Sequence, residues 1–231
     1  PVQMGDCTLV QRDRGTPQGS AISPLLANLF LHYAFDRWLT REFPTVSFER
    51  YADDAVWAFR YREDAERFYR VLPKRLAKFN LEVASEKTRI LRFSRFHPRL
   101  KQRFAFLGFE FQWKLDRQGV PRVKRRTARK RLQAACRRIK EWIKLNRHLP
   151  GGEFFERLNA RLRGHYNYYG VRGNSHSLYR FYTWAINCAF KWLNRRSWRR
   201  SYTWEQFGRV IEFVSLARPC ITEIPRRRVF A

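Results

Sequence analysis

Apolar residues recur at helical spacing in the first third of the chain. Ser23 and Pro24 suit the cap and the first position of a helix. The apolar residues that follow recur every three or four positions and predict one buried face, made of Leu26, Leu29, Phe30 and Tyr33. A second helix is predicted over about residues 63–79, where Pro73 should kink or split it. Its apolar side consists of Ala65, Phe68, Leu72, Leu76 and Phe79.

Segments rich in β-branched and aromatic residues predict strands. Residues 45–61 carry such side chains on both sides of Ala52-Asp53-Asp54, which predicts a β-hairpin with the aspartates at or beside its tip. Further strands are predicted at 81–93 and 103–113, followed by a turn at 116–119 and a short partner strand at 120–125.

Long basic helices are predicted from Thr127 onward. The break Pro150-Gly151-Gly152 separates the first two of them. Their apolar seams are Leu132, Cys136, Ile139 and Ile143, then Phe154, Phe155, Leu158 and Leu162, and then Leu178, Phe181, Ala185, Cys188 and Trp192. The chain is therefore predicted to be an α+β protein, with a mixed part over residues 1–120 and a basic, all-helical part over 121–231.

The charge of the chain is strongly positive and unevenly distributed. It has 48 Lys and Arg against 20 Asp and Glu, a net charge of +28. Residues 116–231 hold 28 of the basic and 7 of the acidic residues, a net charge of +21. This exceeds what solubility requires of a domain, although a ribosomal-type basic surface is an alternative. We therefore expect a nucleic acid to bind mainly along the second half.

Composition also limits the compartment and the class of partner. No apolar run approaches the roughly 20 residues that span a bilayer, so no membrane partner is expected. The four cysteines are far apart and form no C-x-x-C pair, which disfavours a zinc site or a disulfide framework. This usage indicates a reducing, cytoplasmic compartment.

Asp53 and Asp54 are the candidate catalytic residues. Two adjacent carboxylates at a hairpin tip repel each other, so keeping both ionised is unfavourable unless a cation lies beside them. Oxygen ligands favour Mg²⁺ or Mn²⁺, and such a site in a basic protein suits phosphoryl transfer. The alternative is a simple turn, in which Asp is common.

An ordered set of motifs resembles a known family. "YADD" at 51–54 follows "GTPQGSAISPLLANLFL" at 15–31 and precedes "EKTRI" at 86–90 and "FLGF" at 106–109. The set resembles the palm of reverse transcriptases and, more narrowly, of group II intron-encoded reverse transcriptase/maturases. "LNARLRGHYNYYG" at 158–170 is similar to the helical thumb of that family. The resemblance implies a partial right-hand polymerase palm, an antiparallel sheet with packed helices, followed by a basic thumb/maturase domain.

The resemblance implies roles for individual residues. Asp53 and Asp54 would bind catalytic Mg²⁺, two ions in this family, with Mn²⁺ as a substitute. The residues that would contact nucleotide or primer are Gln18 and Gly19 in the Pro-Gln-Gly turn, Tyr51 and Ala52 at the primer end, Lys87 near the leaving pyrophosphate, and Leu107 and Gly108 in a primer-gripping hairpin. For Lys87, a solvated lysine is an equal alternative.

Cations and aromatic side chains alternate in the predicted thumb, as on an RNA-binding surface. The candidate RNA-binding residues are Arg129, Lys130, Arg137, Arg138, Arg161, Arg163, His165, Tyr168 and Tyr169. Helical spacing predicts that about half of the aromatic side chains pack in the core instead.

The sequence departs from the family pattern at two places. The palm of the family has a further metal-binding aspartate upstream of the "GTPQGS" turn, and neither Asp6 nor Asp13 has the matching strand context. An N-terminal reverse transcriptase portion is therefore expected to be missing from this chain. No Cys/His-rich stretch typical of the family's nuclease follows the thumb.

Three functions follow from these observations. The first is an RNA-directed DNA polymerase that extends a DNA primer on an RNA template, its own intron RNA, with deoxynucleoside triphosphates. The second is an RNA-binding maturase that assists intron splicing without polymerisation. The third is a reverse transcriptase recruited to a defence or diversity-generating system.

Overall fold

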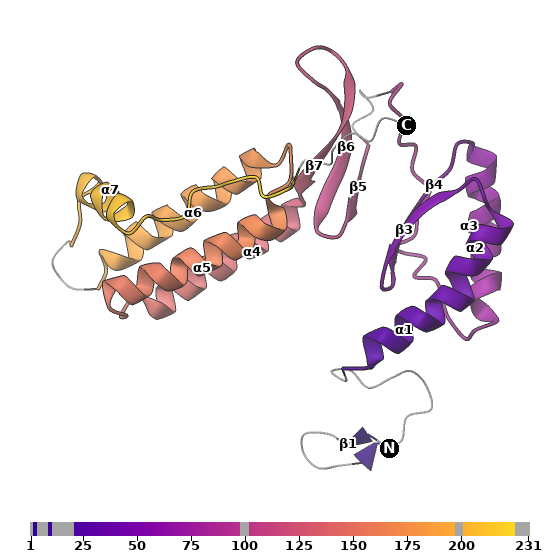
Figure 1. Cartoon of the computed structure of the whole chain (residues 1–231), viewed down its shortest axis with the longest axis horizontal. Helices are drawn as coiled ribbons and strands as arrows, with labels where there is room; N and C mark the ends of the chain where they lie inside the picture. The colour runs from indigo at the N-terminus through magenta and orange to yellow at the C-terminus, as the bar shows by residue number, and fades with distance from the viewer. Residues whose placement is uncertain (1, 4–8, 11–20, 98–101, 197–200, 225–231) are drawn as a thin grey trace. The chain divides into compact units, whose positions relative to one another are not determined.

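The computed structural model describes residues 2–3, 9–10, 21–97, 102–196 and 201–224 (Figure 1). Helices and small antiparallel sheets make it an α+β protein, as predicted. The chain divides into two compact units between Arg92 and Phe93. The boundary predicted near residue 120 separates a palm from a thumb domain, which is a different division from that into compact units, and it stays a prediction.

The first unit combines helices with a two-stranded hairpin. Its elements are β1 (Val2–Gln3), β2 (Leu9–Val10), α1 (Ser23–Leu31), the π-helix η1 (His32–Asp36), α2 (Arg37–Glu42), β3 (Ser47–Tyr51), β4 (Asp54–Ala58) and α3 (Arg62–Ala77). β1 pairs with β2 and β3 with β4, both antiparallel. The predicted hairpin over 45–61 is confirmed.

An aromatic core holds the first unit together. Its buried members are Phe35, Trp38, Leu39, Phe68 and Leu72, which bring η1 and α2 against α3. The rings of Trp38 and Phe68 stack with centroids 6.2 Å apart. Burying each such side chain stabilises the fold by about 1.5–3 kcal/mol.

The predicted buried face of α1 is wrong. Leu26, Leu29, Phe30 and Tyr33 are between 43% and 58% exposed. Phe30 meets Phe79 edge to face at 6.0 Å, but the described core of this unit starts only at Ala34 and Phe35. The helix also begins one residue earlier than predicted, with Ile22 as its cap and Ser23 as its first residue.

Two further expectations for the first unit are corrected. α3 runs through Pro73 as one helix, so the predicted split is wrong, and the predicted kink stays a prediction. Residues 81–93 form no strand, because no strand in the described part of the chain pairs with them and an unpaired strand leaves its backbone groups unsatisfied. They run as turns and irregular backbone instead, where Val83 packs against the core and the hydroxyl of Tyr69 donates to the carbonyl of Thr88 at 3.5 Å.

The second unit begins with a three-stranded antiparallel sheet, β5 (Arg103–Phe106), β6 (Phe109–Leu115) and β7 (Pro121–Thr127). The predicted strand at 120–125 is confirmed as β7. The segment 103–113, predicted as one strand, instead forms two strands that pair with each other, because the left-handed backbone of Leu107 and Gly108 turns the chain between them. The predicted turn closes β6 onto β7, because the carboxylate of Asp116 accepts from the backbone N–H groups of Gln118 and Val120, both at 2.9 Å. These hydrogen bonds and one from Arg122 lower the pKa of Asp116.

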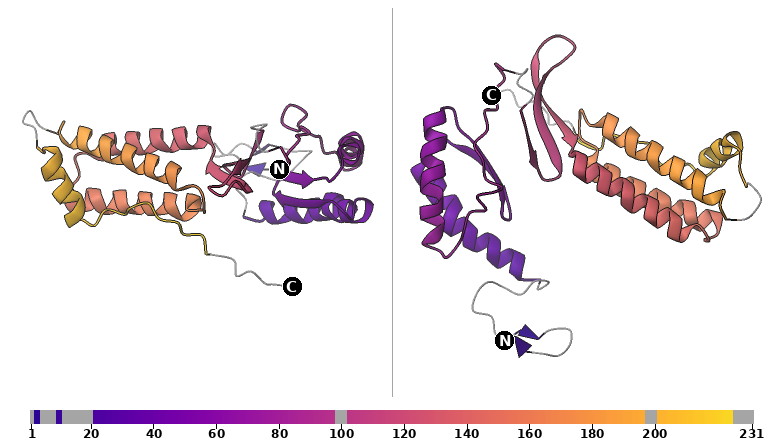
Figure 2. Two further views of the ribbon diagram at one scale, coloured as in Figure 1. Left: turned by 90° about the horizontal axis from the view of Figure 1, so that it is seen from above. Right: turned by 180° about the vertical axis from the view of Figure 1, so that it is seen from behind.

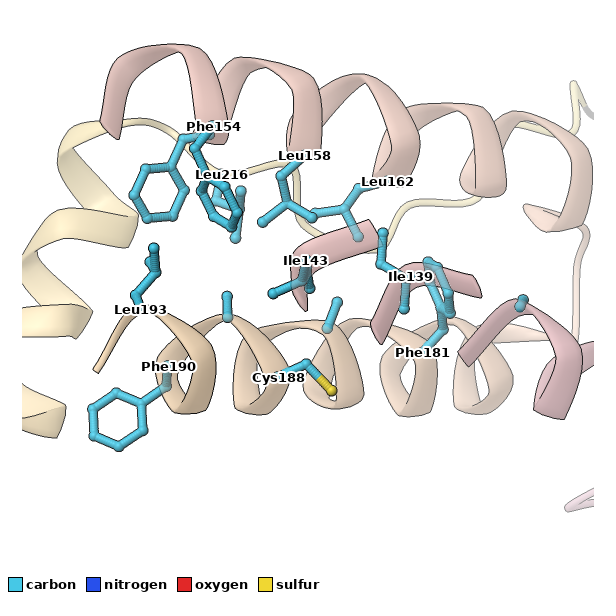
Figure 3. Packing of buried hydrophobic residues seen from close by; sticks show 14 of the residues in the cluster. Ile139, Ile143, Phe154, Leu158, Leu162, Phe181, Cys188, Phe190, Leu193 and Leu216 are labelled. Atoms are coloured by element: carbon cyan, nitrogen blue, oxygen red, sulfur yellow. The ribbon is translucent and has the colours of Figure 1, made fainter. Parts of the chain in front are cut away.

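Four helices follow the sheet: α4 (Arg129–Asn146), α5 (Gly151–Tyr169), α6 (Ser175–Leu193) and α7 (Trp204–Phe213). α4, α5 and α6 run side by side, and α7 lies at the end of this bundle away from the sheet (Figures 1 and 2). The predicted seams meet in one core (Figure 3), although Cys136 and Trp192 are only partly buried. Among the described residues, no helix has both the length and the apolar composition to cross a membrane.

A buried asparagine joins the sheet to the bundle. Asn174 accepts from the backbone N–H of Thr127 at 2.9 Å. Its amide nitrogen donates to the hydroxyl of Thr127 at 2.9 Å and to the carbonyl of Tyr169 at 2.8 Å. The end of β7, the end of α5 and the start of α6 are thereby fixed to one side chain.

Candidate functional site

The aspartate pair lies at the tip of the β3–β4 hairpin. Tyr51 pairs with Asp54, so that Ala52 and Asp53 form a two-residue loop. Ala52 has a φ of +54°, in the left-handed region that favours glycine and costs an alanine about 1–2 kcal/mol. The carboxylates of Asp53 and Asp54 are exposed, and within the described part of the chain neither forms an ion pair.

The donor chemistry of the pair fits a hard divalent cation. Two neighbouring carboxylates offer oxygen ligands only, and Mg²⁺ binds through one or two carboxylates while keeping several waters. Among the residues that the structure describes, no three His, Cys, Asp or Glu side chains come together as a set that could hold a metal ion. The hairpin therefore presents two carboxylate ligands, and water would complete the coordination of such an ion.

Arg50 connects this hairpin to the preceding helices. Its guanidinium donates to both carboxylate oxygens of Asp36, from Nε at 2.8 Å and from Nη2 at 2.6 Å. Nη1 donates to Oδ1 of Asn28 and to the carbonyl of Ala52, both at 3.0 Å. The side chains of Arg50 and Asp36 are only 11% and 16% exposed, and the hydrogen bond to Asp36 raises the pKa of Arg50.

The base of the hairpin rests on the aromatic core of the first unit. Phe48 of β3 and Trp57 of β4 meet the ring of Phe35 with centroids 6.5 Å and 5.9 Å away. Trp57 also meets Phe68 of α3 at 5.1 Å. The strands are therefore fixed at their apolar end, while their tip extends into solvent.

The predicted nucleotide and primer residues fall into separate places. Tyr51, which is 67% exposed, and Ala52 share the turn with the aspartates. Lys87 is exposed on another turn of the first unit. Gln18 and Gly19 lie outside the described residues.

Leu107 and Gly108 form the turn between β5 and β6, with φ values of +48° and +77°. The hydroxyl of Tyr168 donates to the carbonyl of Leu107 at 3.0 Å. A Cβ on Gly108 would lie 3.0 Å from the hydroxyl oxygen of Tyr169. The turn is thus docked on the end of α5, so the structure joins two sets of residues that the sequence had assigned to primer and to RNA separately.

The predicted RNA-binding cations lie on α4 and α5 and are exposed: Arg129, Lys130, Arg137, Arg138, Arg161 and Arg163. The guanidinium of Arg161 also lies 4.4 Å from the ring centroid of Trp142, a cation–π contact. Arg161 therefore has a packing role in addition to its charge.

The predicted aromatic residues of α5 divide between core and surface. His165 stacks on Phe181 with ring centroids 3.8 Å apart, and its buried Nε2 has no hydrogen-bond partner among the residues that the structure describes. Burial, with the charge of Arg138, lowers the pKa of His165 to about 4, so the ring is neutral at pH 7. Tyr169 is partly buried beside it, whereas Tyr168 is exposed.

Two groups of residues were missed by the sequence analysis. The first is the Arg50–Asp36–Asn28 network, because no local pattern connects residues on a helix and a strand. The second surrounds Trp192, a predicted core residue, where Lys144, Arg147 and Arg195 lie 5.5–5.6 Å from the ring centroid. The high density of Arg and Lys near the ends of α4 and α6 is the sequence feature from which this second group could have been predicted.

Two family models match successive parts of the chain. The model described as reverse transcriptase (RNA-dependent DNA polymerase) matches residues 5–111, which include the aspartate pair and the Leu107–Gly108 turn. The model described as group II intron, maturase-specific domain matches residues 132–210, which lie in the helical bundle. No curated protein matches the chain. With these two matches in succession, the chain belongs to the group II intron reverse transcriptase/maturase family.

Proposed function

We propose that the chain provides palm and thumb of an RNA-directed DNA polymerase of group II intron type. The observation that carries the proposal is the exposed carboxylate pair at the tip of an anchored hairpin, within the reverse transcriptase match. Residues 1–120 would form part of the palm with its primer-gripping hairpin, and residues 121–231 the thumb/maturase domain. The compact units divide earlier, between Arg92 and Phe93, so the primer-gripping hairpin packs with the helical bundle.

Asp53 and Asp54 would hold the catalytic metal, two Mg²⁺ ions or Mn²⁺ in their place. A divalent ion bound there lowers the pKa of an attacking hydroxyl and neutralises charge on the phosphates. Tyr51 and Ala52 would contact the primer end and the incoming nucleotide, together with Gln18 and Gly19. Lys87 would stabilise the leaving pyrophosphate.

The basic bundle would hold the template–primer duplex. The exposed cations of α4 and α5 are spaced along two neighbouring helices, which suits contact with successive phosphates. Tyr168 offers an exposed ring on which a base or sugar can stack, and its hydroxyl fixes the Leu107–Gly108 turn. His165 and Tyr169 would support this surface from the side of the core, because both side chains pack inward.

The reaction would take deoxynucleoside triphosphates, a DNA primer and an RNA template, its own intron RNA. We propose a reducing, cytoplasmic compartment for the protein, in keeping with the free thiols of Cys136, Cys188 and Cys220. The third aspartate of the family's two-metal site has no counterpart beside Asp53 and Asp54 among the described residues. Asp6 and Asp13 lie outside those residues.

A maturase that assists splicing without polymerisation is the second candidate. The match to the maturase-specific domain and the net charge of +21 over residues 116–231 favour it, because both indicate RNA binding. RNA binding alone needs no metal-binding carboxylates. The same match disfavours the third reading, a reverse transcriptase of a defence or diversity-generating system.

The two candidates are separated by two assays on the same chain. Extension of a DNA primer on an RNA template with Mg²⁺ and deoxynucleotides is measured together with binding of that template–primer. Extension supports the polymerase. Tight binding without extension, also after an N-terminal reverse transcriptase portion is added in trans, supports the maturase and contradicts our proposal.

A further inference from the structure

The guanidinium of Arg50 is nearly saturated with hydrogen bonds. Of its five N–H donors, four are used by Asp36, Asn28 and the carbonyl of Ala52. The pair with Asp36 is bidentate, a geometry that Arg alone among the cationic side chains provides. The acceptors come from three elements, α1, η1 and the loop of the hairpin, so Arg50 fixes the loop to the helices.

The π-helix explains why Asn28 and Asp36 face the same guanidinium. Eight residues on an uninterrupted α-helix turn about 80° past two full turns, which would place these side chains on different faces. The wide turn of η1, in which the N–H of Arg37 bonds to the carbonyl of His32, accommodates roughly one extra residue. Asn28 and Asp36 then lie within about 20° of each other along the helix.

The bond to Ala52 acts on the backbone that carries the aspartates. The carbonyl of Ala52 belongs to the peptide that leads into Asp53, and Ala52 itself is in the left-handed region. An alanine keeps this conformation only where its surroundings hold it there. By fixing the orientation of this peptide, Arg50 also fixes the direction in which the Asp53 side chain leaves the loop.

We infer that Arg50 is a positioning residue for the metal-binding loop, with Asp36 and Asn28 as its anchors. The inference rests on the proposed function, because it assumes that Asp53 and Asp54 bind a divalent ion. Arg50 is not a metal ligand, and its charge would repel the ion. Its contribution is to hold both carboxylates in one arrangement before the ion arrives, in the way that outer-shell partners orient metal ligands.

The test is the affinity of the whole chain for Mn²⁺ without nucleic acid, measured from the free-ion EPR signal. Arg50→Lys keeps the positive charge but loses the bidentate fork and the bond to Ala52, so we expect affinity to fall about tenfold. Asn28→Ala removes one acceptor from an exposed helix position and should reduce affinity two- to threefold. Arg70→Lys, the same substitution at an exposed site on α3, is the matched control and should leave it unchanged.

Asp53→Asn separates failure of the inference from failure of the proposed function. If Asp53→Asn weakens Mn²⁺ binding while Arg50→Lys behaves as Arg70→Lys, the positioning role is overturned and the metal site stands. If Asp53→Asn has no effect, the metal site itself is wrong and the inference falls with it. Amide exchange at residues 51–54 provides a second readout: it should accelerate at least fivefold in Arg50→Lys with α3 unchanged, and equal rates would contradict the inference.

Discussion

At the scale of single residues, two turns depend on left-handed backbone in different ways. Ala52 adopts this conformation with a side chain, next to a candidate metal ligand and with Arg50 bound to its carbonyl. Gly108 adopts it without one, under the hydroxyl of Tyr169. The first turn thus contains strain that other contacts hold. In the second turn glycine avoids this strain at Gly108, whereas Leu107 next to it, with a φ of +48°, does not.

Gly108→Ala should destabilise the chain by about 1–2 kcal/mol, because an alanine is unfavourable at this φ and its Cβ would lie close to Tyr169. The measurement is urea unfolding followed by circular dichroism at 222 nm. In a Tyr169→Phe background, which removes the crowding oxygen, the same substitution should cost less. An equal cost in both backgrounds would show that crowding plays no part.

His165 should make folding sensitive to acid. Its folded pKa of about 4 lies below the ordinary 6.5, so between these values the unfolded chain takes up a proton that the folded chain does not. Stability should therefore fall by roughly 3 kcal/mol as the pH decreases from 6.5 to 4.

His165→Phe keeps the ring stacked on Phe181 and removes the titration, so it isolates this contribution. As the pH falls from 6.5 to 4, the unfolding free energy of the wild type should decrease by roughly 3 kcal/mol relative to that of this variant. Glu223, whose pKa is lowered by hydrogen bonds from Arg125 and the backbone of Arg172, loses its contribution only below pH 4.5 and in both proteins. A difference that is constant with pH would contradict the assignment.

At the scale of elements, the sequence predicted those helices whose buried faces meet each other. The periodicity of α4, α5 and α6 was sufficient because their seams form one shared core. It failed for α1 and for residues 81–93, where burial or pairing depends on what packs against the segment and not on the segment itself. The π-turn of η1 has no periodic signature, and α7 was missed although Thr203 and Gln206 form a capping box.

Asn174→Ala tests the joint between the sheet and the bundle. The substitution leaves the backbone N–H of Thr127 and the carbonyl of Tyr169 without their partner in a buried site, which should cost about 2–4 kcal/mol. Asn167→Ala, at an exposed position on α5, is the control and should cost less than about 0.5 kcal/mol. Equal urea midpoints for the two variants would refute the structural role of Asn174.

At the scale of the whole molecule, the chain combines an acidic pair in one unit with dense positive charge in the other. The sequence predicted the pair and its hairpin, because the YADD motif and its flanking residues are local in the chain. It did not predict which aromatic side chains of α5 pack inward, nor that Tyr168 contacts the Leu107–Gly108 turn, because both depend on contacts between distant segments.

The positive charge predicts a strong dependence of RNA binding on salt. Replacing Arg137 and Arg163, which are exposed on α4 and α5, by Gln should lower the slope of log K against log salt by about 0.7–0.9 for each phosphate that is no longer neutralised. The measurement is a binding titration at several salt concentrations. Arg70→Gln, a single substitution in the first unit, should leave the slope unchanged, and a decrease half as large as that of the double variant would show that only net charge matters.

The central claim, that the carboxylate pair performs polymerisation, is tested most directly by comparing two aspartate variants in primer extension on an RNA template. Asp53→Asn removes the proposed metal ligand, and Asp64→Asn removes an equal charge from an exposed position in the first turn of α3. At equal occupancy by template–primer, we predict that Asp53→Asn extends more than about a hundredfold more slowly than Asp64→Asn, since loss of a direct ligand should exceed the 10–100-fold effect of outer-shell partners. Equal extension rates in the two variants would contradict the account.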